Sequence, residues 1–276
     1  MPEGDTIFRT ARTLHRALAG RTVTRFETVL PQLARVDDDA PLAGRTVERV
    51  SSAGKHLLVQ FSGELVLRTH MRMSGSWHIY RPGERWRRSR RDMRIAVYTA
   101  KFDAVAFNVP VAEFIPAREI DRHDELRTLG PDLLAEDLDA AEALRRFRER
   151  PTLPIVDAVL NQRIVAGIGN VYKSEVLFAC RIDPFATVES LSEAQLTAII
   201  ETARKFLRAN VGAGLTAMTT YTGYRRTTRR GNPSDRLWVY GRGGKPCRRC
   251  DTPIAMRKHG DDARLTYWCP ACQAGR

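Results

Sequence analysis

Two Cys-x2-Cys pairs near the end of the chain restrict what its last forty residues can fold into. Cys247 and Cys250 form the first pair, Cys269 and Cys272 the second, and eighteen residues separate the pairs. This spacing is typical of a tetrahedral zinc site with four thiolate ligands. A module of this size has too small a core to fold alone, so we expect the zinc to be structural. Four cysteine ligands leave no open position for catalysis.

The charge of the chain favours a polyanionic partner. Lys and Arg number 45 against 32 Asp and Glu, which gives a net charge of +13. Such a surplus attracts nucleic acid or an anionic membrane, although a merely soluble basic protein is an alternative. Two arginine clusters stand out, at positions 85, 87, 88, 90, 91 and 94 and at positions 225, 226, 229 and 230. Either cluster fits phosphate contact or a solvated loop.

The sequence gives no indication of a membrane span or a secretory signal. No apolar run approaches the roughly 20 residues that cross a bilayer, and the N-terminus has no apolar signal region. We therefore expect a reducing cytoplasm. Cysteines rarely form a disulfide framework there, which again favours metal ligation.

The first 120 residues are predicted to form a β-rich domain. Apolar residues at helical spacing predict a helix over residues 5–19. Short β-branched or aromatic segments between Gly, Pro and Asp turns then predict antiparallel strands. These strands are expected over residues 23–29, 46–50, 56–61, 64–69, 76–80, 94–98 and 103–108. The pattern is typical of an antiparallel β-sandwich.

The rest of the chain divides into a helical domain, residues 121–236, and the cysteine module, residues 237–276. Residues 138–210 have a helical pattern, with a capping box at Ser192 and Gln195. A polar stretch over residues 216–236 is predicted to be a mobile loop. In the cysteine module, residues 254–258 and 264–268 should pair as a hairpin between the two cysteine pairs.

A glycine turn, Gly167-Ile168-Gly169-Asn170, precedes an apolar helical segment. A dinucleotide-binding turn would follow a strand, and no strand pattern leads into this one. The turn either directs a helix N-terminus at a phosphate or simply joins two helices.

The start of the chain suggests a nucleophile. Removal of Met1 would expose the secondary amine of Pro2, and a free N-terminal amine has a pKa of about 7.7 to 8. Such an amine attacks an aldehyde-level carbon and forms an iminium. Glu3 beside it can serve as an acid or a base. On this chemistry alone the role is only a suggestion, because many proteins begin with Met-Pro.

Six motifs occur along the chain in one order. They are Pro2-Glu3-Gly4, Gly54-Lys55-His56, His70-Met71-Arg72-Met73-Ser74-Gly75, Gly167-Ile168-Gly169-Asn170 with Glu175, Val239-Tyr240-Gly241, and the four-cysteine finger. In this order they resemble the formamidopyrimidine-DNA glycosylase/endonuclease VIII family, over nearly the whole chain. The resemblance implies an α+β protein with an N-terminal β-sandwich, a helix–two-turn–helix domain and a zinc finger. It also implies that DNA binds in the cleft between the domains.

The resemblance implies catalytic roles for four residues. Pro2 would attack C1′ of the damaged nucleotide, displace the base and form a Schiff base. Glu3 would transfer protons at the sugar. Lys55 matches a family lysine that contacts phosphate and is linked to β-elimination. Arg264 matches a finger arginine that binds phosphate and is linked to δ-elimination.

Three further residues match DNA-binding positions of the family. Asn170 matches a phosphate-binding asparagine. Arg72 and Met73 lie where the family inserts side chains into the stack vacated by the flipped base. A flexible, apolar Met suits such a wedge.

The sequence departs from the purine-specific branch, which has an Asp-Pro-Arg-Arg-Phe-Gly loop. The matching residues 107–114 read Phe-Asn-Val-Pro-Val-Ala-Glu-Phe. Pro31-Gln32-Leu33 and Tyr267-Trp268-Cys269-Pro270 also resemble endonuclease VIII, so oxidised pyrimidines are the favoured substrates.

The predicted function is therefore a bifunctional glycosylase and apurinic/apyrimidinic (AP) lyase of base excision repair. We expect it to be a monomer that acts on damaged nucleoid DNA, with zinc and no small-molecule cofactor. The alternative is a non-catalytic DNA- or RNA-binding zinc-finger protein, which would need neither Pro2 nor Glu3.

Overall fold

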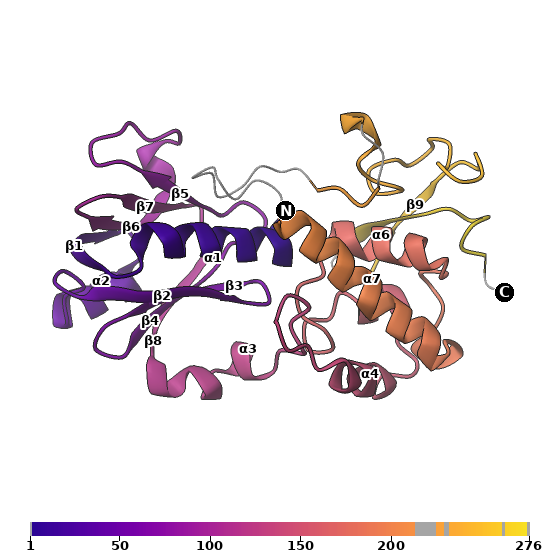
Figure 1. The fold of residues 1–276 in the computed structure, drawn as a ribbon, viewed down its shortest axis with the longest axis horizontal. Coiled ribbons are helices and arrows are strands. Elements are labelled where there is room, and N and C mark those ends of the chain that lie inside the picture. Colours follow the sequence, from indigo (N-terminus) through magenta and orange to yellow (C-terminus); the bar gives the residue numbers. More distant parts are fainter. Residues whose placement is uncertain (1, 213–224, 229–231, 261–262, 275–276) are drawn as a thin grey trace. The chain divides into compact units, whose positions relative to one another are not determined.

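The computed structural model describes residues 2–212, 225–228, 232–260 and 263–274. The chain forms two compact units, with the described residues up to 128 in the first unit and those from 129 in the second (Figure 1). The predicted division into residues 1–120, 121–236 and 237–276 stays a prediction. No described helix combines the length and apolar character needed to cross a membrane.

The first unit begins with helix α1, which is followed by eight antiparallel strands (Figure 1). The spatial order of the strands is β5-β7-β6-β1-β2-β3-β4-β8. The helices of this unit are α1 (Gly4–Leu18), α2 (Pro31–Asp39) and α3 (Asp124–Arg127). The strands are β1 (Arg21–Thr28), β2 (Thr46–Ala53), β3 (His56–Phe61), β4 (Leu65–His70), β5 (Ser76–Tyr80), β6 (Met93–Thr99), β7 (Asp103–Phe107) and β8 (Val111–Pro116).

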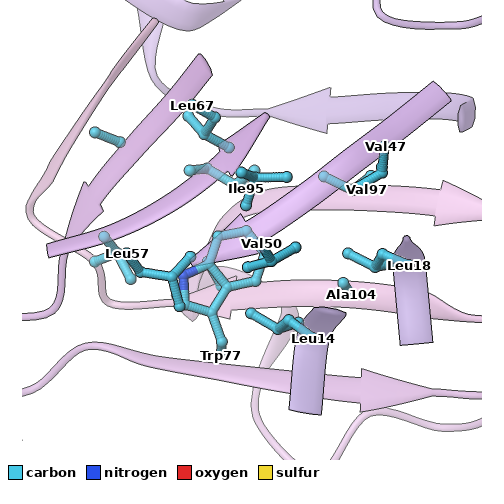
Figure 2. Close-up of a cluster of buried hydrophobic side chains, with 14 of the residues drawn as sticks. Leu14, Leu18, Val47, Val50, Leu57, Leu67, Trp77, Ile95, Val97 and Ala104 are labelled. Atoms are coloured by element: carbon cyan, nitrogen blue, oxygen red, sulfur yellow. The ribbon is translucent and has the colours of Figure 1, made fainter. Parts of the chain in front are cut away.

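Strand β1 belongs to both layers of a sandwich. Its first residues, Arg21 and Thr22, pair with β2, whereas the strand from Val23 onward pairs with β6. Apolar side chains of both layers and of α1 pack in one core, and Figure 2 shows Trp77 in this cluster with residues such as Leu57 and Leu14. The predicted β-sandwich with an N-terminal helix is confirmed.

Two α-helices and one strand of the first unit, α2, α3 and β8, were not predicted from the sequence. Helix α2 starts with Pro31, whose fixed φ suits a first helical turn, but it buries only Leu33 and so lacks an apolar stripe. Strand β8 pairs with β4 along its whole length, from Leu65 opposite Pro116 to His70 opposite Val111. The 107–114 segment that departs from the purine-specific branch therefore includes part of an edge strand.

The second unit contains the predicted helical region. Its helices are α4 (Ala140–Arg148), α5 (Ile155–Ala158), α6 (Asn170–Cys180) and α7 (Glu193–Val211). The capping box is present, because the Gln195 amide donates to Ser192 Oγ at 3.2 Å and the Ser192 amide donates to Gln195 Oε1 at 2.8 Å. Most of the 216–236 loop lies outside the described residues.

The cysteine module contains a two-stranded hairpin of β9 (Ala255–His259) and β10 (Arg264–Trp268). In its register, Arg264 lies opposite His259 and Trp268 opposite Ala255. The hairpin was predicted one residue too early at its start, since Ile254 precedes β9. Next to the hairpin, the buried Cys247, Ile254 and Cys269 pack with Phe178 of α6 and Val239.

Candidate active site and nucleic-acid interface

The start of α1 gives the two predicted N-terminal catalytic residues different surroundings. Pro2 is partly exposed, whereas Glu3 is fully buried. Glu3 is the N-cap of α1, and its carbonyl oxygen accepts the amide N–H groups of Thr6 at 2.9 Å and Ile7 at 3.1 Å. The first helical turn therefore fixes the backbone of Glu3 next to Pro2. Once removal of Met1 frees the Pro2 amine, a buried carboxyl beside it suits proton transfer where water is excluded.

Pro2 lines a small cavity of about 100 Å³. Thr6 and Thr10 of α1 line it as well, and the 71–77 segment supplies Met73 and Trp77. The structure thus brings Pro2 and the predicted wedge residue Met73 to the same cavity. The remaining lining residues are Met71, Ser74, Gly75, Ser76 and Arg88.

The loop between β4 and β5 holds Met73 outward. Gly75 donates its amide to Met71 O at 2.8 Å, and a Cβ on Gly75 would lie 2.5 Å from that oxygen, so only glycine closes this turn. Arg72 has φ 48°, and its amide donates to His70 Nδ1 at 3.1 Å. Met71 is buried, but Met73 is 70% exposed. The loop therefore presents an apolar side chain to solvent, as a wedge requires.

Lys55 lies in the turn between β2 and β3 and is partly exposed. Burial, with the charges of Arg72 and Lys55, lowers the pKa of His70 to about 4. The same histidine thus lies in the electrostatic field of both cations. The structure brings the predicted Lys55 and Arg72 to one end of the β3–β4 pair.

The sequence analysis did not predict an ionic network around the buried side chain of Arg68. Arg68 is 4% exposed, forms ion pairs with Glu113 and Glu125, and contacts His56 Nδ1 at 2.8 Å. Burial, with the nearby His70 and Arg68, lowers the pKa of His56 to about 3. Neutral His56 can then accept the guanidinium N–H. These residues come from four separate elements, β3, β4, β8 and α3, so no local motif reveals the network.

The side chain of Gln162 holds the glycine turn before α6 in place through two hydrogen bonds. The side-chain amide of Gln162 accepts from the Gly167 N–H and donates to Ile168 O, both at 3.0 Å. Gly167 has φ 111°, which favours glycine. Asn170 is the first residue of α6, and its Oδ1 is buried without a hydrogen-bond partner among the described residues. This arrangement fits the predicted phosphate-binding position but does not test it.

Glu175 connects α6 to the start of the cysteine module. Its fully buried carboxylate accepts the amide N–H groups of Trp238, Val239 and Tyr240, each at 2.8 Å, and the hydroxyl of Thr227. Burial raises its pKa, and the four donors oppose that rise. The motif at Glu175 and the motif at Val239 therefore meet in one structural contact.

The four predicted zinc ligands converge. Their sulfur atoms all lie within 4.8 Å of one another. Cys250 Sγ is 3.4 Å from Cys269 Sγ and 3.3 Å from Cys272 Sγ, and Cys247 Sγ is 3.9 Å from Cys272 Sγ. A tetrahedral site with Zn–S bonds of 2.3 Å has S–S edges of about 3.8 Å. The donor set and its geometry therefore fit a structural zinc ion.

Arg264, the first residue of β10, lines a second cavity of about 490 Å³ in the second unit. Lys173, which is buried, also lines it and donates from Nζ to Thr266 Oγ1 at 2.8 Å. Opposite Arg264, His259 Nε2 lies 2.8 Å from the carboxylate of Asp157, on α5. The contact ties the hairpin that bears Arg264 to the helical part of this unit.

The two arginine clusters differ. The arginines at positions 85, 87, 88, 90 and 91 are exposed. In the second cluster Arg225 is buried, and its guanidinium lies 5.5 Å from the centre of the Tyr172 ring. The Arg225 side chain is therefore not part of a solvated loop in this structure. Arg226 is exposed, and positions 229 and 230 lie outside the described residues.

The sequence matches three domain families. Residues 1–110 match the formamidopyrimidine-DNA glycosylase N-terminal domain, residues 129–222 its H2TH (helix–two-turn–helix) domain, and residues 244–275 the zinc finger found in FPG and IleRS. Together these matches cover most of the chain and follow the order of the observed elements.

Named relatives match the chain over almost its full length. A probable endonuclease 8 2 of Streptomyces coelicolor is 41% identical, over 100% of this chain and 95% of that protein. Endonuclease 8 2 of Mycobacterium tuberculosis is 40% identical, over 99% and 100%. The DNA-(apurinic or apyrimidinic site) lyase Nei2 of Mycolicibacterium smegmatis is 37% identical, over 99% of both chains.

The fold is also that of a solved structure. The Lactococcus lactis Fpg protein, crystallised with DNA containing an oxidised pyrimidine, has a TM-score of 0.83 to this chain and 23% identity, over 99% of this chain and 100% of that one. With the domain matches and the relatives at 37–41% identity, this likeness identifies the chain. It belongs to the formamidopyrimidine-DNA glycosylase/endonuclease VIII family.

Proposed function

We propose that the protein is a bifunctional DNA glycosylase and AP lyase of base excision repair, which acts through a Pro2 Schiff base. The observation that carries this proposal is the cavity shared by Pro2 and Met73. A nucleophile and an exposed apolar wedge beside one cavity suit an enzyme that extrudes a nucleotide and attacks its sugar. The relatives named as endonuclease 8 and as AP lyase support the same activity.

The chemistry assigns the Pro2 nitrogen the attack on C1′ of the damaged nucleotide. As the N–C1′ bond forms, the bond between C1′ and the base breaks, and the base leaves with a proton. Loss of the ring oxygen from C1′ then gives the iminium, and removal of a C2′ proton expels the 3′ phosphate. Glu3, buried next to Pro2, is the group we assign mainly to the proton transfer that accompanies base release.

The phosphates on either side of the lesion need cationic or polar partners. We assign Lys55, Asn170 and Arg264 to this role, with Lys55 assisting β-elimination and Arg264 assisting δ-elimination. The four cysteines would hold zinc, which cross-links the module that bears Arg264. Arg72 and Met73 would fill the space left by the extruded nucleotide.

We assign oxidised pyrimidines as the substrate class. The segment that departs from the purine-specific loop leads into the edge strand β8. This difference supports the view that other side chains fill the space left by the extruded nucleotide. We further propose a monomer that acts on nucleoid DNA in a reducing cytoplasm, where the four thiols stay available to zinc.

A lesion panel tests the proposal. Duplexes and single strands containing an oxidised pyrimidine, an oxidised purine or an abasic site would be incubated with the protein lacking Met1. We expect base release and strand cleavage, with the oxidised pyrimidine preferred. Glu3→Gln should lose most base release and keep cleavage at the abasic site. Tight binding to every duplex without cleavage would instead support the non-catalytic DNA-binding alternative.

A further inference from the structure

The arginine-rich segment between β5 and β6 delivers one guanidinium to the Pro2 cavity. Of its exposed arginines, only Arg88 is among the residues that line this cavity. Ser76 is also in the lining, and its hydroxyl shares a hydrogen bond of 3.0 Å with His78 Nε2. Burial, then the charges of Arg88 and Arg87, lowers the pKa of His78 to about 4. The charge of Arg88 is therefore felt at His78, which is hydrogen-bonded to the lining residue Ser76.

An aromatic anchor holds this segment in place. The Trp86 ring lies 6.3 Å from the Tyr80 ring and 5.7 Å from the Phe107 ring, centroid to centroid. The Arg87 amide donates to Tyr80 Oη at 3.2 Å, and the Arg90 guanidinium lies 5.1 Å above Trp86. These contacts fix the residues on both sides of Arg88, so the segment is more than a solvated loop.

Arg90, which lies over Trp86, also connects the segment to strand β1. Arg90 forms an ion pair with Glu27 at 3.0 Å, and Glu27 also accepts the hydroxyl of Tyr98 at 2.8 Å. Ser89 Oγ accepts the amide of Arg91 and starts the short 3-10 turn that leads into β6. The backbone at Arg88 is thus held between two packed points, Trp86 and Arg90.

We propose that Arg88 is a specificity-determining residue, whose guanidinium donates hydrogen bonds to a carbonyl oxygen of the extruded base. The proposal rests on the proposed function and extends it to the recognition of the base. The base and the sugar carbon attacked by Pro2 belong to one nucleotide, so a donor in the Pro2 cavity is within reach of that nucleotide. The rest of the lining combines apolar side chains, Met71, Met73 and Trp77, with the hydroxyl-bearing Thr6, Thr10, Ser74 and Ser76, which suits a base, a flat ring with polar edges.

The test compares two substrates in one duplex sequence. The first contains thymine glycol and the second an abasic site, and single-turnover rates are measured with enzyme in saturating excess. Arg88→Ala should slow release of thymine glycol about 10- to 100-fold, the effect of one lost charge-assisted hydrogen bond, and change abasic-site cleavage less than about threefold. Arg88→Lys should be intermediate, because it keeps the charge and loses the planar fork.

Arg81→Ala is the matched control, since Arg81 is an exposed arginine of the same segment that lies outside both the cavity lining and the arginine cluster at positions 85–94. It should leave both single-turnover rates unchanged. Trp86→Ala, which releases the anchor, should reproduce the selective loss of Arg88→Ala. Equal losses on both substrates with Arg88→Ala would assign the residue to phosphate and overturn the proposal, as would no loss on either. A wild-type protein that releases no base would refute the proposed function itself.

Discussion

At the residue scale, two side chains of the site have a degree of exposure that is unusual for their residue type. Glu3 is a fully buried carboxyl, and Met73 is an apolar side chain that is 70% exposed. Burial of a carboxyl and exposure of a large apolar group both cost free energy unless something else compensates. Binding of an extruded nucleotide would cover the exposed side chain of Met73.

Met73 gives the first prediction. Met73→Ala should slow base release from duplex DNA by more than it slows cleavage at a preformed abasic site, because the wedge offsets the few kcal/mol lost on unstacking. An abasic site has no base to extrude. The measurement is the ratio of the two single-turnover rates. Equal losses on the two substrates would contradict a wedge role and indicate a general defect.

At the element scale, the β3–β4 pair carries one buried histidine, His56, and one partly buried histidine, His70, and both stay neutral in the folded chain. The pKa of His56 is lowered to about 3 and that of His70 to about 4, in both cases mainly by burial. The unfolded chain, with histidines near 6.5, binds protons that the folded chain does not. Stability should therefore fall as the pH drops below about 6.5, and the loss should level off near the folded pKa values.

This linkage gives a prediction for His56. Between pH 7 and pH 5 its share of the lost unfolding free energy should be about 2 kcal/mol. His56→Gln, which cannot take up a proton, should flatten the pH dependence of stability by about that amount. Urea unfolding at pH 7, 6 and 5 measures it. A variant with the same slope as the wild type would show that His56 is charged in the folded protein.

The hairpin of the cysteine module gives a prediction about metal. Removal of zinc by a chelator, or Cys247→Ser in protein shown to be metal-free, should unfold residues 237–276 and weaken DNA binding. The reason is that the thiolates take the place of a larger core. Circular dichroism and DNA affinity before and after chelation are the measurements. Full affinity in metal-free protein would refute the structural role of zinc.

The elements also show which features a sequence reveals. Cysteine spacing and period-2 strands are local, so the zinc site, seven strands of the first unit and both strands of the hairpin could be predicted. Helix α2 buries one residue and strand β8 is an edge strand, so neither has a clear local pattern. The Arg68 network depends on pairing between distant strands, and Arg88 reaches the Pro2 cavity only through the packing of Trp86.

At the scale of the whole molecule, the net charge of +13 predicts a strong dependence of DNA affinity on salt. Each phosphate neutralised releases counterions, so the log–log slope should be about −0.9 per phosphate on duplex DNA. Fluorescence anisotropy with a labelled duplex over a range of salt concentrations measures the slope. An affinity independent of salt would mean that the exposed arginines do not contact the backbone.

The central claim is that the Pro2 amine is the nucleophile. Its iminium with C1′ should be reduced by borohydride to a stable amine, which leaves the protein covalently attached to lesion-containing DNA. Peptide mapping of this adduct is the most direct test, with Met1-retaining protein as the control. The account predicts attachment at residue 2 and no adduct when Met1 blocks the amine. Attachment at Lys55, or efficient trapping with Met1 in place, would contradict it and indicate a lysine-dependent lyase.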